Sequence, residues 1–261
     1  MPATLARTCP LCGLRFSNTP LLELHIREDH PRPERRPARD NDNPADTSDD
    51  SAGKAGIKIR RMSRNDIGAA CKVLGLAFAD NPNTLVIARG DRARGQRMME
   101  SGARFAKLGR RYSHVLVAED MGRVVGVLNA IEWPNCQLRM SEKLKIAPSM
   151  IRVTGLGLPR AFTMMSVWAK HDPRKRHWHV GPIGVHPERQ GGGIGKALLA
   201  AFLDMADAQG SPAYLETDVD RNVALYEKFG FKAIEQEDIS GVNNRFMWRE
   251  AGACSPVPGH S

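Results

Sequence analysis

The sequence predicts an α/β domain from residue 57 onward, preceded by a small metal-binding unit and a flexible linker. Three observations support this organisation. Residues 1–30 hold two Cys and two His at zinc-ligand spacing. Residues 31–56 contain no Ile, Leu, Val, Met, Phe, Trp or Tyr, so they cannot offset their ordering entropy by burying apolar surface. From residue 57, short strand-like runs alternate with amphipathic segments of helix length.

Composition excludes several classes of protein. The chain has 261 residues, of which 41% are hydrophobic, enough for one or two domains with a buried core. No run approaches the ~18 apolar residues of a membrane span, and the first residues lack the apolar core of a signal peptide. Five scattered cysteines do not form the even set of a disulfide framework. We therefore expect a cytoplasmic protein that does not contact membranes.

The net charge of +9 is unevenly distributed. Residues 1–30 are neutral, and residues 31–56 hold five basic and six acidic residues, so the positive excess lies in the α/β domain. An excess of this sign suits an anionic ligand, and the simpler explanation is solvated surface charge.

The N-terminal unit is predicted to bind a structural Zn²⁺ ion. Two residues separate Cys9 from Cys12, twelve residues follow, and four more separate His25 from His30. Two thiolates and two imidazoles are usual ligands of a four-coordinate structural zinc, and residues 7–30 resemble the C2H2 zinc finger family. The alternative is four unrelated residues with free thiols. A unit this small cannot bury a core of its own, so the metal would supply the folding energy.

The finger is predicted to be a poor reader of DNA. The base-contacting positions of such a finger fall on Asn18, Leu21 and Leu24, and only Asn18 is suited to a base edge. The finger has no net charge, whereas DNA affinity depends on neutralising phosphates. We expect Leu21 and Leu24 to contact a protein partner, or the finger to be purely structural, in preference to nucleic acid binding.

Hydrophobic periodicity and capping residues predict the first elements of the α/β domain. In chain order these are a strand at 57–60, a helix from Ser63 to Phe78, a helix at 91–108, a hairpin of strands at 115–118 and 124–128, and one or two helices at 141–171. The hairpin prediction depends on the glycine-containing turn between its strands.

A strand, a glycine-rich turn and a helix follow one another between residues 177 and 209. The strand at 177–185 contains Pro182, which cannot donate to a ladder and belongs at an edge or a bulge, so we expect incomplete pairing. Residues 190–196 read QGGGIGK and open a helix, which points backbone amides and a helix N-terminus at an anion. The spacing matches neither a P-loop nor a dinucleotide-binding motif. The alternative is a flexible loop that needs no ligand.

Two motifs give the α/β domain a family resemblance. Residues 190–195 match the pattern Q-x-x-G-x-G, and residues 222–231, NVALYEKFGF, place an Asn, a Tyr and a Gly-Phe pair in order after a strand at 213–217. From about 57 to 250 the chain resembles the GNAT acetyltransferase superfamily, and within it the branch of puromycin N-acetyltransferase. The resemblance implies the GNAT fold, a mixed, splayed central sheet flanked by helices, and leaves 251–261 as a flexible tail.

The resemblance implies acetyl-CoA as cosubstrate. The amides of residues 191–196 would hold its pyrophosphate, and the open strand edge at 183–185 would pair with the pantetheine arm. An Ile183 or Val185 amide would polarise the thioester carbonyl. The residues expected to bind acetyl-CoA are Ile183, Gly184, Val185, Gln190, Gly191, Gly192, Gly193, Ile194, Gly195, Lys196 and Asn222.

The same resemblance implies how protons are transferred. Tyr226 matches the family's general acid, which would protonate the departing thiolate after an amine attacks the thioester directly. The alternative is a core tyrosine. Glu216 is the leading candidate for the general base, with a substrate-orienting carboxylate or an ordinary ion pair equally open. His179 and a water chain are further candidates.

The cysteines outside the finger carry no motif. Cys71 is expected in the core, and Cys254 lies in a tail rich in Pro and Gly. Cys136 has no assigned role. We expect no Cys–His pair and therefore no covalent route.

The leading functional prediction is an N-acetyltransferase acting on a primary amine of a small molecule, because both motifs are intact. The alternatives are a CoA-sensing or zinc-finger adaptor protein without catalysis, an acetylase of a protein docked by the finger, and an acetylase linked to nucleic acid. The acceptor pocket is expected from the helices that follow residues 78 and 141. An apolar lining is suggested by Trp133, Met164, Met165 and Trp168.

Overall fold

The computed structural model describes residues 7–8, 15–16 and 56–253, which fall in two units, Met1–Ala52 and Gly53–Ser261. In the first unit, β1 (Arg7–Thr8) and β2 (Arg15–Phe16) pair antiparallel, and they flank Cys9 and Cys12 in the sequence. Residues 31–55 of the predicted linker lie outside the described residues, as do the predicted zinc ligands and finger contacts Cys9, Cys12, Asn18, Leu21, Leu24, His25 and His30.

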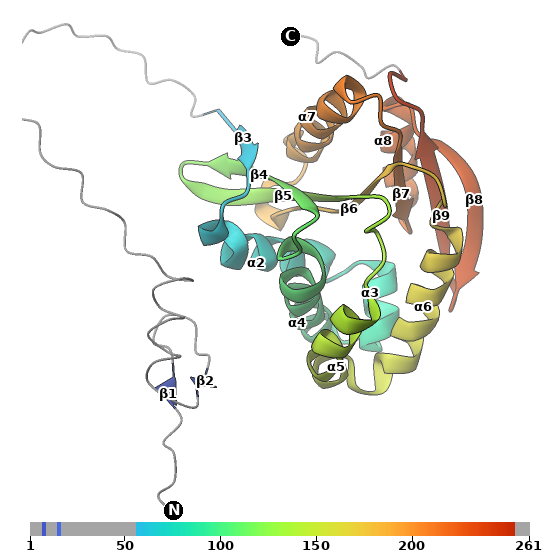
Figure 1. Cartoon of the computed structure of the whole chain (residues 1–261). Helices are drawn as coiled ribbons and strands as arrows, with labels where there is room; N and C mark the ends of the chain where they lie inside the picture. The colour runs from blue at the N-terminus through green and yellow to red at the C-terminus, as the bar shows by residue number, and fades with distance from the viewer. Residues whose placement is uncertain (1–6, 9–14, 17–55, 254–261) are drawn as a thin grey trace, which may run out of the picture. The chain divides into compact units, whose positions relative to one another are not determined.

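The second unit is built on a mixed sheet of seven strands in the order β3-β4-β5-β6-β7-β9-β8 (Figure 1). Its strands are β3 (Lys58–Arg61), β4 (Ser113–Asp120), β5 (Arg123–Glu132), β6 (Trp178–Val185), β7 (Ala213–Thr217), β8 (Lys232–Ile239) and β9 (Val242–Arg249). Neighbouring strands are antiparallel except β6 and β7, which are parallel. The predicted strands and hairpin are confirmed with small shifts in their bounds, whereas β8 and β9 were not identified from the sequence.

Helical segments connect these strands. They are η1 (Arg64–Asp66), α2 (Ile67–Phe78), α3 (Pro82–Ala88), α4 (Arg92–Gly102), η2 (Ala103–Leu108), α5 (Met140–Thr154), η3 (Gly155–Gly157), α6 (Leu158–His171), η4 (Pro187–Arg189), α7 (Ile194–Ala208) and α8 (Asp220–Lys228). The helix predicted from Ser63 opens with the short turn η1, where the Ser63 amide and hydroxyl both donate to Asp66 at 2.7 Å. Asp91 caps α4 by accepting from the Arg94 amide at 2.9 Å.

Helix α3 was not predicted, although its start carries local signals. The Asn81 side chain accepts a hydrogen bond from the Thr84 amide at 3.1 Å. Pro82 lies in the first turn, where its missing N–H has no intrahelical partner to lose. With seven residues, α3 is too short for its hydrophobic periodicity to stand out.

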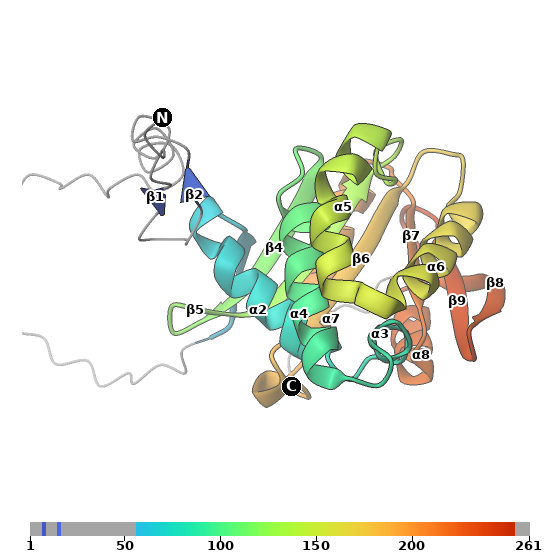
Figure 2. The same cartoon turned by 90° about the horizontal axis from the view of Figure 1, so that it is seen from below.

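The sheet carries helices on both faces (Figures 1 and 2). On the α7/α8 face, a core cluster joins Leu116 of β4 to Phe202 of α7. On the opposite face, which we call the α2/α6 face, Val115 and Val117 of β4 pack with α2, and Phe246 of β9 packs with α6. Successive side chains of β4 therefore point to opposite faces of the sheet, and both faces are buried. In the described part of the chain, no helix is long and apolar enough to cross a membrane.

Candidate active site

Strands β6 and β7 pair at one end and separate toward the other. Their parallel pairing is confined to Trp178 opposite Ala213 and His179 opposite Tyr214. On its other side β6 stays paired with β5 as far as Val185. The expected incomplete pairing is therefore observed, and the edge of β6 that faces β7 is open from Val180 onward.

A β-bulge lies in the middle of β6. Leu128 pairs with Ile183 and Ala130 pairs with Val180, so Gly181 and Pro182 together oppose the single residue Asn129. The Asn129 side-chain amide donates to the Gly181 carbonyl at 2.9 Å. Pro182 thus occupies the bulge that the sequence analysis allowed for it.

Beyond the bulge, the open edge holds the residues predicted to bind pantetheine. Ile183 and Val185 pack on the α7/α8 face. Gly184 lies against α2, where a Cβ atom would come within 2.8 Å of the Leu74 side chain. Glycine at this position therefore lets α2 approach the open edge closely.

The glycine-rich turn after β6 has the geometry of an anion cradle. Residues 190–193 are exposed, and Gly191 and Gly193 have φ of +83° and +79°, a region that favours glycine. Gly193 is the N-cap of α7, and no side chain caps it. Because the first amides of a helix have no intrahelical acceptor, those of Ile194, Gly195 and Lys196 are suited to an anion. Gln190 anchors the turn by donating to the Val185 carbonyl at 3.1 Å.

Tyr226 lies on α8, nearly buried, with 9% of its surface exposed. Its ring packs edge-on against Phe231 at 5.9 Å between centroids. Burial, with a smaller contribution from the Asp218 carboxylate, raises the pKa of Tyr226 to about 12. The hydroxyl therefore keeps its proton at neutral pH, as a general acid must. Asn222 lies in the first turn of the same helix, partly buried.

The Asp218 carboxylate after β7 is tied to the start of α3. Asn81 donates to it from its side-chain amide at 2.7 Å, and the Asn83 backbone amide donates to it at 2.9 Å. These bonds connect the start of α3 to the end of β7.

The two candidates for the general base lie side by side. His179 Nε2 is 2.9 Å from Glu216 Oε2, and both side chains are close to buried. Burial disfavours the charged form of His179, but the carboxylates of Glu216 and Asp172 outweigh it, so the pKa of His179 lies well above its usual value. Glu216 Oε1 is buried without a hydrogen-bond partner, and so is the Tyr214 hydroxyl. One carboxylate oxygen of the pair therefore lies buried and takes no part in the contact with His179.

The residues predicted to line an acceptor pocket differ in their exposure to solvent. Met164 is buried in the core, Met165 is partly buried, and Trp133 is 39% exposed. Trp168 donates its indole N–H to the Asn244 side chain at 3.2 Å. Met164 therefore acts as a packing residue.

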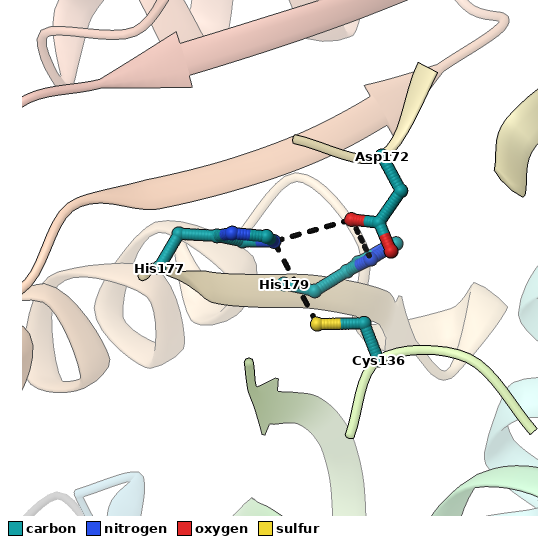
Figure 3. Close-up of side chains that lie close together, drawn as sticks. All are labelled: Cys136, Asp172, His177 and His179. Atoms are coloured by element: carbon teal, nitrogen blue, oxygen red, sulfur yellow. Dashed lines mark hydrogen bonds and ion pairs between the residues drawn. The ribbon is translucent and has the colours of Figure 1, made fainter. Parts of the chain in front are cut away.

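A cluster that sequence reasoning missed lies next to His179. The side chains of Cys136, Asp172, His177 and His179 place one donor atom each within 4.8 Å of one another (Figure 3). Cys136 Sγ is 3.6 Å from His177 Nε2. The expectation that no Cys–His pair exists was therefore wrong, because the fold joins residues 41 positions apart. Cys71, in contrast, is buried in the core as expected.

Charges in this cluster reinforce one another. Burial opposes the charged form of His177, but contacts with Asp172 and Cys136 raise its pKa to about 9. Burial also opposes ionisation of Asp172 and Cys136, yet the neighbouring imidazoles lower the pKa of both groups. A carboxylate, a thiol with a lowered pKa and two imidazoles thus share one nearly buried site.

Comparison with known proteins identifies the family. The sequence profile of the acetyltransferase (GNAT) family matches residues 87–231, more than half of the chain. The chain belongs to this family. The α/β fold and mixed sheet agree with a crystal structure titled as histone acetyltransferase HPA2 and related acetyltransferase from Corynebacterium glutamicum, with a TM-score of 0.57, 20% identity, and coverage of 77% of this chain and 99% of that one.

Curated relatives match over shorter stretches. The mycothiol acetyltransferase of Streptomyces coelicolor is 37% identical over 73 residues, 27% of this chain and 24% of the relative. The N-alpha-acetyltransferase RimI of Mycobacterium tuberculosis is 40% identical over 81 residues, 29% of this chain and 50% of the relative. The matches thus span from a quarter to half of these relatives. The finer resemblance to puromycin N-acetyltransferase stays a prediction.

Proposed function

We propose that the chain transfers the acetyl group of acetyl-CoA to a primary amine of a small molecule, by direct attack through a tetrahedral intermediate. The observation that carries this proposal is the open edge of β6, which runs from the His179–Glu216 pair to the cradle at residues 190–196. The seven residues from His179 to Val185 span about 20 Å, room for an extended thioester arm. The mycothiol and N-alpha-acetyltransferase relatives support acetyl transfer as the shared chemistry.

In this proposal the backbone binds the donor. Amides of residues 191–196 hold the pyrophosphate, assisted by the dipole of α7. The open edge at 183–185 pairs with the pantetheine arm, and an Ile183 or Val185 amide stabilises the oxyanion that forms on the thioester carbonyl. Gln190 fixes the cradle relative to this edge because it bonds the Val185 carbonyl. Asn222 supports the donor from α8.

In this proposal, side chains carry out the proton transfers. Glu216 Oε1, buried and without a partner, accepts a hydrogen bond from the attacking amine, while Oε2 stays with His179. The amine's proton leaves through Glu216 or a water chain, because the raised pKa of His179 keeps that imidazole protonated. When the intermediate collapses, the carbon–sulfur bond breaks and Tyr226 donates its proton to the CoA thiolate.

CoA release tests the proposal directly. We expect the full-length chain to release free thiol from acetyl-CoA in the presence of at least one small primary amine. Turnover confined to peptides or proteins would favour a protein acceptor docked by the finger. Binding of acetyl-CoA without turnover over a broad panel would favour a CoA sensor.

Glu216→Gln should lower kcat by ~10²-fold or more, the usual scale for a group that assists proton transfer. Gln keeps the size of the side chain but removes the anionic oxygen that faces the amine. KM for acetyl-CoA should change little. Asp204→Asn, which neutralises an exposed carboxylate on α7, serves as the matched control. Normal kcat in Glu216→Gln would leave Glu216 as an ordinary ion-pair residue.

We further propose that residues 7–30 form a C2H2 zinc finger, with Cys9, Cys12, His25 and His30 as ligands and Leu21 and Leu24 available to a protein partner. A linker at 31–56 would join it to an acetyltransferase domain at 57–250, with a tail at 251–261. Pairing of β1 with β2 supports the proposal, because the hairpin brings together the two ends of the segment that holds Cys9 and Cys12.

Cys9→Ser should release one zinc per chain and unfold residues 7–30, because the metal supplies the folding energy there. The acetyltransferase domain should melt at an unchanged temperature, since the linker transmits little. Metal analysis and calorimetry on the same preparation check both expectations. An unchanged zinc content in the variant would contradict the finger.

A further inference from the structure

The four clustered donors come from segments that are separate in sequence. Cys136 lies in the loop after β5, Asp172 follows the last residue of α6, His177 directly precedes β6, and His179 is its second residue. His177 is fully buried, and the Asp172 side chain is 7% exposed. Asp172 Oδ1 is 3.2 Å from His177 Nε2 and 3.5 Å from His179 Nδ1 (Figure 3).

These contacts converge on a common point and do not form a catalytic relay. In a Cys-His-Asp relay, the thiol and the carboxylate contact opposite nitrogens of the imidazole. Here Cys136 and Asp172 both face the same nitrogen, Nε2 of His177. The other nitrogen, Nδ1, is occupied by the Lys175 carbonyl at 2.7 Å.

Asp172 and His179 also have an outer partner, on the side that faces away from the cluster. Asp172 Oδ2 accepts from the Gln137 side chain at 2.7 Å, and His179 Nε2 contacts Glu216. The inner atoms, Asp172 Oδ1 and His179 Nδ1, are buried without hydrogen bonds. Imidazoles backed by a carbonyl or carboxylate, and carboxylates that accept an outer hydrogen bond, are characteristic of metal sites when their inner donor atoms face a common point.

The spacing and donor types select the metal. Bonds of about 2.0–2.3 Å to N, O and S in a tetrahedron place neighbouring ligand atoms roughly 3.2–3.6 Å apart. Three of the six separations, 3.2, 3.5 and 3.6 Å, fall in this range, and all six lie within 4.8 Å. One thiolate, two imidazoles and one carboxylate suit zinc, whereas calcium and magnesium prefer shells of six or more oxygens.

We propose that Cys136, Asp172, His177 and His179 bind one structural Zn²⁺ within the acetyltransferase domain. Four protein ligands complete the coordination, so the ion would fasten the loop after β5 and the end of α6 to the start of β6. Binding through Nδ1 would also hold the His179 ring with its Nε2–H directed at Glu216, which makes His179 a positioning residue. The site does not depend on acetyl transfer.

Metal analysis of the full-length chain tests this site. Cys9→Ser/Cys12→Ser removes the thiolates of the predicted finger, so zinc bound by the finger no longer contributes to the measured zinc content. We expect this variant to purify with one zinc per chain, and to lose that equivalent when Cys136→Ser is added. Cys71→Ser, which alters a buried cysteine outside the cluster, should keep it. A Cys9→Ser/Cys12→Ser chain that neither carries zinc nor takes up one equivalent would overturn the proposal.

Spectroscopy decides the case even if Cys136→Ser does not fold. X-ray absorption at the zinc edge of the Cys9→Ser/Cys12→Ser chain should show one sulfur and three nitrogen or oxygen ligands. Replacement by Co²⁺ should give visible absorption typical of tetrahedral coordination, with a thiolate charge-transfer band. Zinc without a sulfur ligand, or octahedral cobalt, would show surface binding and refute the site.

Discussion

Gly193→Glu should reduce the affinity for acetyl-CoA by about 100-fold or more, with the fold retained. A Cβ atom at this position meets no neighbour within 4 Å, so the side chain fits, but it places a carboxylate at the N-terminus of α7. Two like charges about 4 Å apart near a protein surface repel by about 4 kcal/mol, and tenfold in affinity corresponds to about 1.4 kcal/mol. Titration calorimetry with acetyl-CoA measures the effect.

The matched control is Gly210→Glu at the opposite end of the same helix. Gly210 also has a positive φ, +59°, and open space around its Cβ position. Both variants therefore share the backbone strain and the added charge, while α7 separates them by about 22 Å. Equal affinities for acetyl-CoA in the two variants, or normal affinity in Gly193→Glu, would show that this turn does not bind the pyrophosphate.

The parts of the fold that the sequence predicts are those whose hydrophobic pattern is strong and local. The strand at 177–185, the glycine turn and α7 follow one another with clear changes of period, and Pro182 indicated the bulge. Strand β8 was missed because nearly all of its residues are exposed, so its sequence, KAIEQEDI, shows no buried face. Its identity as a strand depends on pairing with β9, which is a long-range contact.

The candidate site also contains some residues that local sequence motifs predict and others that they do not. The residues predicted to bind acetyl-CoA, and Tyr226 as the predicted acid, follow from motifs that are contiguous in sequence. The metal cluster does not, because Cys136 and Asp172 reach it through the loop after β5 and the end of α6. Its one local signal is His177-x-His179, since alternate residues of a strand share a face. Pairing of His179 with Glu216 likewise required the register of β6 against β7.

Tyr226→Phe should lower kcat by ~10²–10⁴-fold, the usual contribution of a general acid. The substitution removes one hydroxyl and little volume, so packing against Phe231 should survive. KM for acetyl-CoA should change much less, because the loss falls on the transition state alone. With its pKa raised to about 12, Tyr226 stays protonated at neutral and mildly alkaline pH, so its own ionisation should not limit the rate there.

Tyr112→Phe is the control for loss of a hydroxyl, because Tyr112 is a partly exposed residue whose ring lies beneath Arg111 and Arg139. It should leave kcat unchanged. If Tyr226 only packs in the core, Tyr226→Phe should instead lower the melting temperature and leave turnover near normal. Measuring kcat and melting temperature on one preparation separates the two roles. Normal kcat in Tyr226→Phe would indicate that water or another residue donates the proton.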